Sequence, residues 1–295
     1  MTPKPRRRYT LALPDRRTLS LGARTLVMGI LNVTPDSFSD GGQHADLSRA
    51  VDAALAMVAA GADLIDVGGE STRPGAAPVD EARERARVVP VVAALSRQCP
   101  VPISVDTTKA AVARAAIDAG AVIVNDVSGL RKDPALATVA ADAGAALVLM
   151  HMRGTTADMY RHAEYADVAS EVAAELAWSV ETAGARGVTR AALVIDPGIG
   201  FAKQAAQSWR LLACLEHPAL RALDLPLLVG ASRKSFLQAA IGERPAPERD
   251  AASIAAATVA VLSGAHIVRV HDVPGSVQAV RVADMISSAA EAGSP

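Results

Sequence analysis

Short apolar runs that end in a polar residue recur along the whole chain. The runs are centred on Val27, Leu64, Ile103, Ile123, Leu147, Leu193, Leu227 and Ile267. Runs this short, rich in β-branched and aliphatic residues, are typical of strands buried on both faces, as in a parallel sheet. The polar residues that follow them include Asn32, Asp66, Asp106, Asn125, His151, Asp196, Lys234, Arg269 and His271. Because these residues share one end of their strands, we expect a single site.

Each run is followed by a segment with helical periodicity. The predicted helices cover residues 47–60, 79–97, 108–119, 134–143, 168–183, 208–215, 254–262 and 277–286. Eight strand–helix units with polar residues at one end favour a (β/α)₈ TIM barrel, whose active site lies at the C-terminal strand ends. A doubly wound α/β sheet is the second alternative.

The N-terminal residues indicate a separate small element. Residues 9–13 and 18–21 alternate around a Pro-Asp turn, which predicts a β-hairpin that closes the bottom of the barrel. The preceding Arg6-Arg7-Arg8 could suggest twin-arginine export, but the next apolar segment is too short, and a solvated tail is favoured. We therefore expect an N-terminal tail and hairpin over residues 1–24 and the barrel over residues 25–295.

Composition restricts the function classes. The 295 residues are 51% hydrophobic but only 3% aromatic, which fits one large domain with an aliphatic core. A net charge of −1 and a pI near 6.6 give no overall positive field for nucleic acid or an anionic membrane. The Ala-rich residues 251–270 are too polar for a membrane span. Cys99 and Cys214 lie far apart without metal-ligand spacing, so we expect free thiols in a reducing, cytoplasmic compartment.

Two loops carry most of the candidate chemistry. Residues 32–42 and 68–75 are rich in Gly, Pro, hydroxyl and charged residues, so they cannot continue a strand or a helix. Loops with such content often carry function. Because they follow adjacent predicted strands, they could together form a mobile lid, although two ordinary surface turns are the simpler reading of either loop alone.

Eight motifs resemble those of the dihydropteroate synthase family. They are MGILNVTPDSFSDGG at 28–42, GGESTRPG at 68–75, SVDT at 104–107, NDVSG at 125–129, MHMRG at 150–154, DPGIGF at 196–201, SRKS at 232–235 and RVHD at 269–272. They occur in the family's order, and none is broken. The first two are long enough to be highly specific. The family fold is a (β/α)₈ barrel, in agreement with the strand–helix pattern.

The resemblance implies condensation of 6-hydroxymethyl-7,8-dihydropterin pyrophosphate with 4-aminobenzoate, which yields 7,8-dihydropteroate and pyrophosphate for folate synthesis. It also implies a dissociative, SN1-like path, a Mg²⁺ cofactor and a homodimer. An aromatic amine is already a neutral nucleophile, so no general base is required. The task of the protein is then electrostatic stabilisation of the leaving group and exclusion of water.

By resemblance, Asp106, Asn125, Asp196 and Lys234 bind the pterin, and Phe201 flanks its plane. A carboxylate and an amide suit the donor and acceptor edges of that ring. The structural alternative for Asp196 is a salt bridge to Lys234 or an Arg, because a buried carboxylate needs a partner. The functional alternative for Lys234 is a Schiff base, as in barrel aldolases.

For the leaving group, the family assigns Arg269 and His271 to the diphosphate and Asn32 to Mg²⁺. Strand alternation directs Arg269 and His271 to the same side, and an Arg fork suits phosphate oxygens. A single neutral oxygen donor suits a cation that keeps its waters and shares phosphate oxygens. The predicted catalytic residues are therefore Asn32, Asp106, Lys234, Arg269 and His271.

For the second substrate, the family places the benzoate carboxylate at Ser235, where a helix should begin and its free N–H groups favour an anion. The predicted neighbours of this substrate are Arg233, Thr72, Arg73, Pro74 and Phe38. We expect Met150 and His151 to form pocket wall rather than an acid or a base.

Three other functions remain open from the residues. A corrinoid methyltransferase that uses methyltetrahydrofolate shares the pterin-binding barrel, but it has no reason to keep pyrophosphate ligands. A non-catalytic paralogue would act as a binding protein, and its lid loops would be expected to have eroded. A generic barrel lyase fits least well. Arg269, His271 and the two intact loops favour the synthase.

Overall fold

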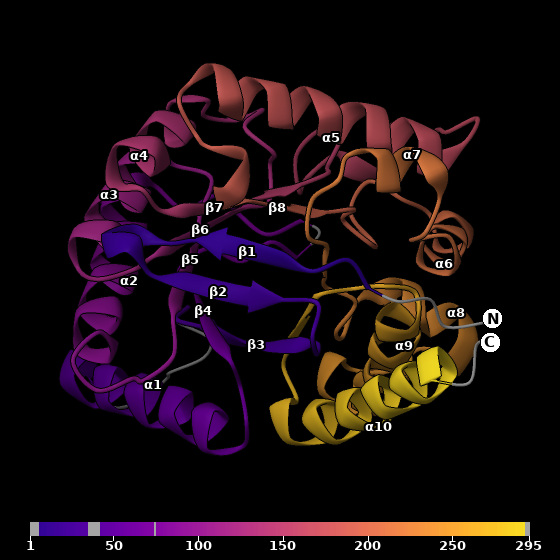
Figure 1. Cartoon of the computed structure of the whole chain (residues 1–295). Helices are drawn as coiled ribbons and strands as arrows, with labels where there is room; N and C mark the ends of the chain where they lie inside the picture. The colour runs from indigo at the N-terminus through magenta and orange to yellow at the C-terminus, as the bar shows by residue number, and fades with distance from the viewer. Residues whose placement is uncertain (1–5, 35–41, 74, 293–295) are drawn as a thin grey trace.

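The structure is a computed structural model that describes residues 6–34, 42–73 and 75–292, with backbone alone at 42–45 and 291–292. It contains one parallel sheet of eight strands with helices around it (Figure 1). The strand order is β8-β7-β6-β5-β4-β3-β10-β9, so strands that follow one another in the chain are neighbours in the sheet. A bridge between Ile195 and Leu227 joins the two ends. The sheet is a closed (β/α)₈ barrel, and the doubly wound alternative is wrong.

The barrel strands are short and buried, as the apolar runs predicted. They are β3 (Leu26–Asn32), β4 (Leu64–Gly68), β5 (Ile103–Asp106), β6 (Ile123–Asp126), β7 (Ala146–Met150), β8 (Leu193–Asp196), β9 (Leu228–Val229) and β10 (Ile267–Val270). Successive residues face opposite sides of a strand. In β3, Leu26 and Met28 pack inside the barrel, whereas Val27 and Leu31 pack against the helices. Two apolar layers therefore flank the sheet.

The helices form the outer ring of the barrel. They are α1 (Gly42–Ala59), α2 (Glu81–Leu95), α3 (Ala110–Asp118), α4 (Ala135–Ala143), α5 (Val168–Ala185), α6 (Ala205–Ala213), α7 (Pro218–Ala222), α8 (Gln238–Ile241), α9 (Asp250–Leu262) and α10 (Val273–Ala292). Side-chain caps stabilise several of the starts; for example, Asp80 accepts from Arg83 N and Asp167 from Ala169 N. No helix in the described residues is long and apolar enough to cross a membrane.

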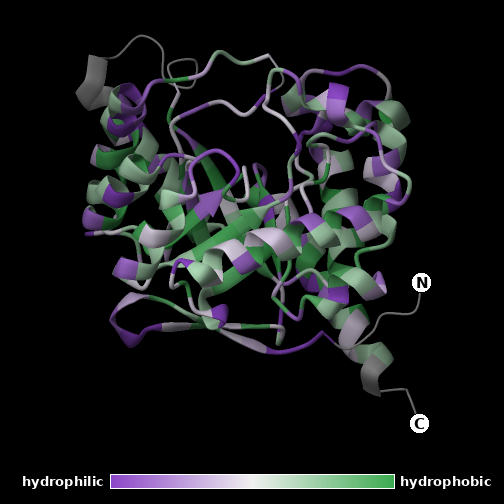
Figure 2. Ribbon diagram, turned by 90° about the horizontal axis from the view of Figure 1, so that it is seen from above, coloured by the Kyte–Doolittle hydropathy of each residue, from purple (hydrophilic) through white to green (hydrophobic). Residues whose placement is uncertain are grey.

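The predicted N-terminal hairpin is present. Strands β1 (Tyr9–Ala12) and β2 (Thr18–Leu21) pair antiparallel around a short turn, η1 (Pro14–Arg16). Leu11, Leu13 and Leu21 pack into the apolar interior of the barrel. Figure 1 looks onto this hairpin, and Figure 2 shows it beneath the barrel, opposite the loops that follow the strands. The hairpin thus closes the N-terminal end and leaves the C-terminal end to the site.

Candidate active site

The polar residues that end the strands converge at the C-terminal mouth of the barrel. Asp106 lies beside Gly68 on one neighbouring strand and beside Asn125 on the other. Asp196 lies beside Met150 of β7. All three polar side chains are buried. A parallel sheet brings the carboxyl ends of its strands to one edge, so these side chains lie together at one end of the barrel.

The guanidinium of Arg269 connects two of the barrel carboxylates. Its Nε donates to Asp66 Oδ2 at 2.6 Å, and its second terminal nitrogen donates to Asp106 Oδ2 at 2.7 Å. Asn125 Nδ2 also donates to Asp66 Oδ2, at 2.9 Å. The other terminal nitrogen of Arg269, Nη1, makes no hydrogen bond to any residue that the structure describes. That nitrogen is available to a ligand in the mouth.

The electrostatics of Asp106 follow from its burial. Burial raises the pKa of Asp106 to about 7, the positive charge of Arg269 opposes this shift, and the negative charge of Asp66 adds to it. Asp66 itself is fully buried, and its Oδ1 has no hydrogen-bond partner. Arg269 therefore holds two carboxylates that would otherwise repel each other across the mouth.

Asp196 begins a tight loop at the end of β8. Its Oδ1 accepts from Gly198 N at 2.7 Å, and Gly198 adopts φ +66°. A Cβ on Gly198 would lie 2.0 Å from the carbonyl oxygen of His151, so only glycine fits. Burial raises the pKa of Asp196, and the charge of Lys234 opposes this. Asp196 forms no ion pair with Lys234 or with another described base, so the salt-bridge alternative is not observed.

Lys234 reaches the same loop from the end of β9. Its Nζ donates to Ile199 O at 2.5 Å and lies 4.0 Å from the centroid of the Phe201 ring. Burial lowers the pKa of Lys234 to about 7, and the charge of Asp196 opposes this shift. A lowered pKa would also suit a Schiff base. The contacts with a carbonyl and a ring face also suit an ammonium group that hydrogen-bonds to a ligand.

Ser232 contacts His271 at two atoms. The backbone N–H of His271 donates to Ser232 Oγ at 3.2 Å, and Ser232 Oγ lies 3.0 Å from His271 Nδ1. A serine oxygen has two acceptor lone pairs and one proton, so it can serve both contacts, and where it donates to Nδ1 the neutral imidazole carries its proton on Nε2. Burial lowers the pKa of His271 to about 3, with a further contribution from Arg269. The imidazole of His271 is therefore uncharged near neutral pH.

Two comparisons of sequence decide the family. Residues 28–271 match the family described as pterin binding enzymes. The chain is 51% identical over 262 residues to a dihydropteroate synthase of Mycobacterium leprae, an alignment that covers 87% of this chain and 91% of that protein. The chain belongs to the dihydropteroate synthase family.

Solved structures of other synthases share the whole fold. The Xanthomonas albilineans dihydropteroate synthase with 4-aminobenzoic acid has a TM-score of 0.85 and 42% identity, over 97% of this chain and 100% of that one. The Burkholderia cenocepacia dihydropteroate synthase complexed with 7,8-dihydropteroate has a TM-score of 0.83 and 41% identity, over 96% of this chain and 98% of that one. The expected family and fold are confirmed.

The residues assigned by resemblance to the second substrate lie toward the rim. The guanidinium of Arg233 makes a two-pronged ion pair with Asp250, at 2.6 and 2.8 Å. Ser235 is exposed, and its Oγ lies 3.2 Å from Tyr160 Oη. The expected helix does begin at Ser235, but it is a 3₁₀ segment, η5 (Ser235–Leu237), followed by the single turn of α8. Its dipole is weaker than that of a long helix.

The structure describes part of each of the two candidate loops, residues 32–42 and 68–75. Thr72 is half-buried and Arg73 is exposed. Their loop contacts the loop after β7, where Gly75 N donates to Thr156 O at 3.3 Å. The predicted Phe38 and Pro74 lie outside the described residues.

Asn32 is the predicted ligand of Mg²⁺. It ends β3 beside Gly68, is half-buried, and its side-chain amide makes no hydrogen bond to another described residue. No group of three His, Cys, Asp or Glu residues in the described part of the chain could hold a metal alone. A free amide oxygen at the mouth fits a cation that is held mainly by phosphate oxygens and water.

Two residues near the candidate site received no role from the sequence. Asp66 was grouped with the strand-end polar residues, but nothing in its neighbourhood distinguished it from Asp126, which instead caps the backbone of Ser128 and Leu130. Lys203 was not expected in the interior at all, yet it is 1% exposed. A buried lysine has no local sequence signature, because its acceptors come from the tertiary fold.

Proposed function

We propose that the residues at the mouth carry out dihydropteroate synthesis, in which 6-hydroxymethyl-7,8-dihydropterin pyrophosphate and 4-aminobenzoate are joined and pyrophosphate leaves. The observation that carries this proposal is the arrangement of Asp106, Asn125 and Asp196 opposite Lys234, with Arg269 and His271 beside them. The carboxylates and Lys234 would thus supply acceptors and a cationic donor for a flat heterocycle. Arg269 and His271, beside them, would supply donors for a diphosphate. A simple lyase has no need for this pairing.

The pterin ring would lie among the buried carboxylates. Asp196 would accept hydrogen bonds from the amino edge of the ring, while Lys234 would donate to the ring carbonyl and a ring nitrogen. Asp106 and Asn125 would contact the opposite part of the ring. Phe201, which carries the Lys234 ammonium on its face, would flank the ring plane. Charged hydrogen bonds in a water-poor site are stronger than in solution, so they fix the orientation of the ring.

Departure of the diphosphate is the step that requires electrostatic stabilisation. The bond between the exocyclic methylene carbon and the diphosphate oxygen breaks, and its electron pair leaves with the diphosphate. The free Nη1 of Arg269 and the Nε2 proton of His271 would donate to the oxygens on which charge accumulates. Donors fixed before the reaction stabilise that charge without reorganisation.

Asn32 would hold Mg²⁺ through its side-chain oxygen. When bound, Mg²⁺ supplies a positive charge that makes pyrophosphate a better leaving group. The location of Asn32, on the strand next to β10, brings it to the same side of the mouth as Arg269 and His271.

The amine of 4-aminobenzoate would then attack the cationic methylene carbon. The carbon–nitrogen bond forms, and the nitrogen releases one proton, so dihydropteroate and pyrophosphate are the products. We place the benzoate carboxylate near Ser235, with the remaining predicted contacts Arg233, Thr72, Arg73, Pro74 and Phe38 around it. Arg233 would act mainly through its ion pair, which orders the turn before Ser235.

We also propose a cytoplasmic homodimer. Val282, Met285 and Ile286 are 60%, 72% and 48% exposed on α10, at the spacing of one helix face. An apolar stripe of this kind suits a second copy of the chain. Cys99 and Cys214 are free, in keeping with a reducing compartment. Light scattering should show a dimer that Met285→Glu converts to a monomer, while Trp178→Glu on α5 leaves it intact. A monomeric wild type would contradict the proposal.

The reaction is tested directly. The protein is incubated with the pterin pyrophosphate, 4-aminobenzoate and Mg²⁺, and dihydropteroate and pyrophosphate are measured together. We expect equal amounts of both products. Pterin binding without product would indicate a non-catalytic paralogue, and methyl transfer from methyltetrahydrofolate to a corrinoid would indicate the methyltransferase.

A further inference from the structure

Lys203 lies behind the candidate pterin pocket, and no step of the proposed reaction uses it. Its side chain is 1% exposed, and it is the largest side chain among the fully buried ones. Burying an ammonium group is costly unless every donor is satisfied. A lysine retained in such a place has a specific set of partners, and those partners indicate its role.

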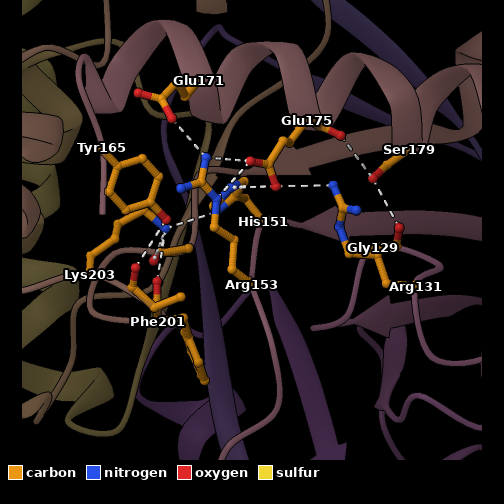
Figure 3. A network of polar contacts seen from close by, with 12 residues as sticks. Gly129, Arg131, His151, Arg153, Tyr165, Glu171, Glu175, Ser179, Phe201 and Lys203 are labelled. Carbon is orange, nitrogen blue, oxygen red and sulfur yellow. Dashed lines mark hydrogen bonds and ion pairs between the residues drawn. The ribbon is translucent and has the colours of Figure 1, made fainter. Parts of the chain in front are cut away.

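The three N–H donors of Lys203 meet three acceptors. Nζ lies 2.9 Å from His151 Nδ1, 3.0 Å from Gly198 O and 2.9 Å from Phe201 O (Figure 3). A protonated amine has three protons and no acceptor, so in that form the match is complete, although burial lowers the pKa of Lys203. Two of the acceptors belong to the loop between Asp196 and Phe201, which contributes both of those side chains to the pocket.

The backbone of this loop adopts conformations that need support from the surrounding structure. Gly198, Gly200 and Ala202 all have positive φ, at +66°, +79° and +48°. Positive φ is costly for a residue with a side chain such as Ala202, so the surroundings must impose the conformation. Lys203 binds two of the loop carbonyls from behind, while Lys234 binds Ile199 O from the pocket side. The loop is therefore fixed between two lysines.

Glu175 lies on the other side of the His151 ring. Where Nδ1 accepts from Lys203, the neutral ring carries its proton on Nε2, which lies 3.3 Å from Glu175 Oε2 but makes no hydrogen bond to a described residue. Glu175 is itself held by Arg153, with Nε···Oε1 2.7 Å, and by Arg131 at 3.1 Å (Figure 3). Burial lowers the pKa of His151 to about 4, so the ring stays neutral and remains an acceptor near neutral pH.

We propose that Lys203 is a positioning residue of the pterin pocket: with His151 as its anchor, it holds the loop so that Asp196 and Phe201 face the ring. This inference rests on the proposed function, because it assumes that the pocket binds a pterin. It assigns His151 a role different from pocket wall, since its ring supports the loop from behind. The substrate would never contact Lys203.

The test uses Lys203→Met, which keeps the length of the side chain and removes its donors. Affinity for 6-hydroxymethyl-7,8-dihydropterin is measured by calorimetry, and the KM for 4-aminobenzoate by turnover. We expect the pterin Kd to rise at least tenfold, while the KM for 4-aminobenzoate changes less than twofold. Leu212→Ala in α6 is the matched control, because it removes core packing at a residue outside the loop. It should lower the melting temperature and leave the pterin Kd unchanged.

A second pair of variants keeps the test decisive if Lys203→Met does not fold. His151→Asn retains an acceptor near the position of Nδ1, whereas His151→Leu leaves one Lys203 proton unpaired; both lose the Glu175 contact. The pterin Kd should rise several-fold more in the Leu variant than in the Asn variant. Equal Kd values for the pair, or for Lys203→Met and wild type, would overturn the positioning role. Failure of the wild type to bind the pterin would instead overturn the proposed function.

Discussion

Arg269 donates through Nε to Asp66 Oδ2 at 2.6 Å, although 203 residues separate the two in the chain. The same guanidinium bonds Asp106, so one cation neutralises two buried carboxylates before any substrate binds. Its remaining nitrogen makes no hydrogen bond to a described residue and would donate to the proposed diphosphate. Arg269 thus links the two halves of the proposed pterin pyrophosphate site, and its replacement should affect both stability and chemistry.

We expect Arg269→Ala to destabilise the fold by about 3–5 kcal/mol, because it leaves two buried carboxylates without their cation. Arg269→Lys keeps the charge and should be close to wild type in urea unfolding. Both variants should slow single-turnover pyrophosphate release by about 100-fold, since a transition-state donor is lost or misplaced. Affinity for the pterin alcohol should change little in the Lys variant. Equal losses for the alcohol and the diphosphate, with an unchanged chemical step, would place Arg269 in ring binding alone.

Asp196→Asn should weaken pterin binding and leave the fold intact. The amide can still accept from Gly198 N, but it loses the charged hydrogen bond to the amino edge of the ring. Such a bond is worth roughly 1.5–3 kcal/mol, or about 10- to 150-fold in affinity. Calorimetry with the pterin alcohol measures the loss, and circular dichroism checks the fold. An unchanged pterin Kd would remove Asp196 from the site.

Binding of 4-aminobenzoate should depend on pyrophosphate. If the loops at residues 32–42 and 68–75 complete the benzoate site only when the diphosphate position is filled, the two ligands are positively coupled. Equilibrium dialysis should then show weak binding to the free protein and at least tenfold tighter binding, roughly the factor given by 1.4 kcal/mol, with pyrophosphate and Mg²⁺ present. The same Kd with and without pyrophosphate would exclude this order of binding.

The contribution of the buried histidines to stability should fall as pH drops from about 6.5 toward 4, whereas Asp106, whose pKa burial raises to about 7, contributes in the opposite direction over this window. Burial lowers the pKa values of His151 and His266 to about 4 and that of His271 to about 3, while an unfolded histidine titrates near 6.5. In this window the unfolded chain binds more protons at these histidines than the native one does, so each histidine contributes a loss of up to about 1.4 kcal/mol per pH unit. Above about pH 6.5 the histidines are neutral in both the folded and the unfolded states, so their contribution to the unfolding free energy is fully present.

The substitution His266→Asn removes one of these titrating histidines, so its contribution to the pH dependence can be measured. His266 Nδ1 accepts from Leu227 N at 3.1 Å, and the Asn oxygen can replace that acceptor without titrating. The unfolding free energy of the variant, measured in urea between pH 7.5 and 4.5, should depend less steeply on pH than that of the wild type. Parallel curves for the two proteins would show that His266 does not contribute to the slope.

The sequence by itself determined the architecture and the chemical character of the site. Apolar runs such as Leu64–Gly68 specify strands because burial on both faces favours aliphatic residues in succession, and the polar residues after them mark the open end of the barrel. The alternation in residues 9–21 likewise determined the hairpin. These properties follow from neighbours in the chain, so they can be predicted without tertiary structure.

Only the tertiary structure decided which of these residues meet. Closure of the sheet places β10 beside β3, which brings Arg269 to Asp66 and Asp106 and leaves one nitrogen free. The pairing of Arg233 with Asp250 and the burial of Lys203 on His151, 52 residues away, likewise depend on packing between separate segments of the chain. A local pattern fixes the face on which a side chain lies, but its partner is fixed by packing between distant segments.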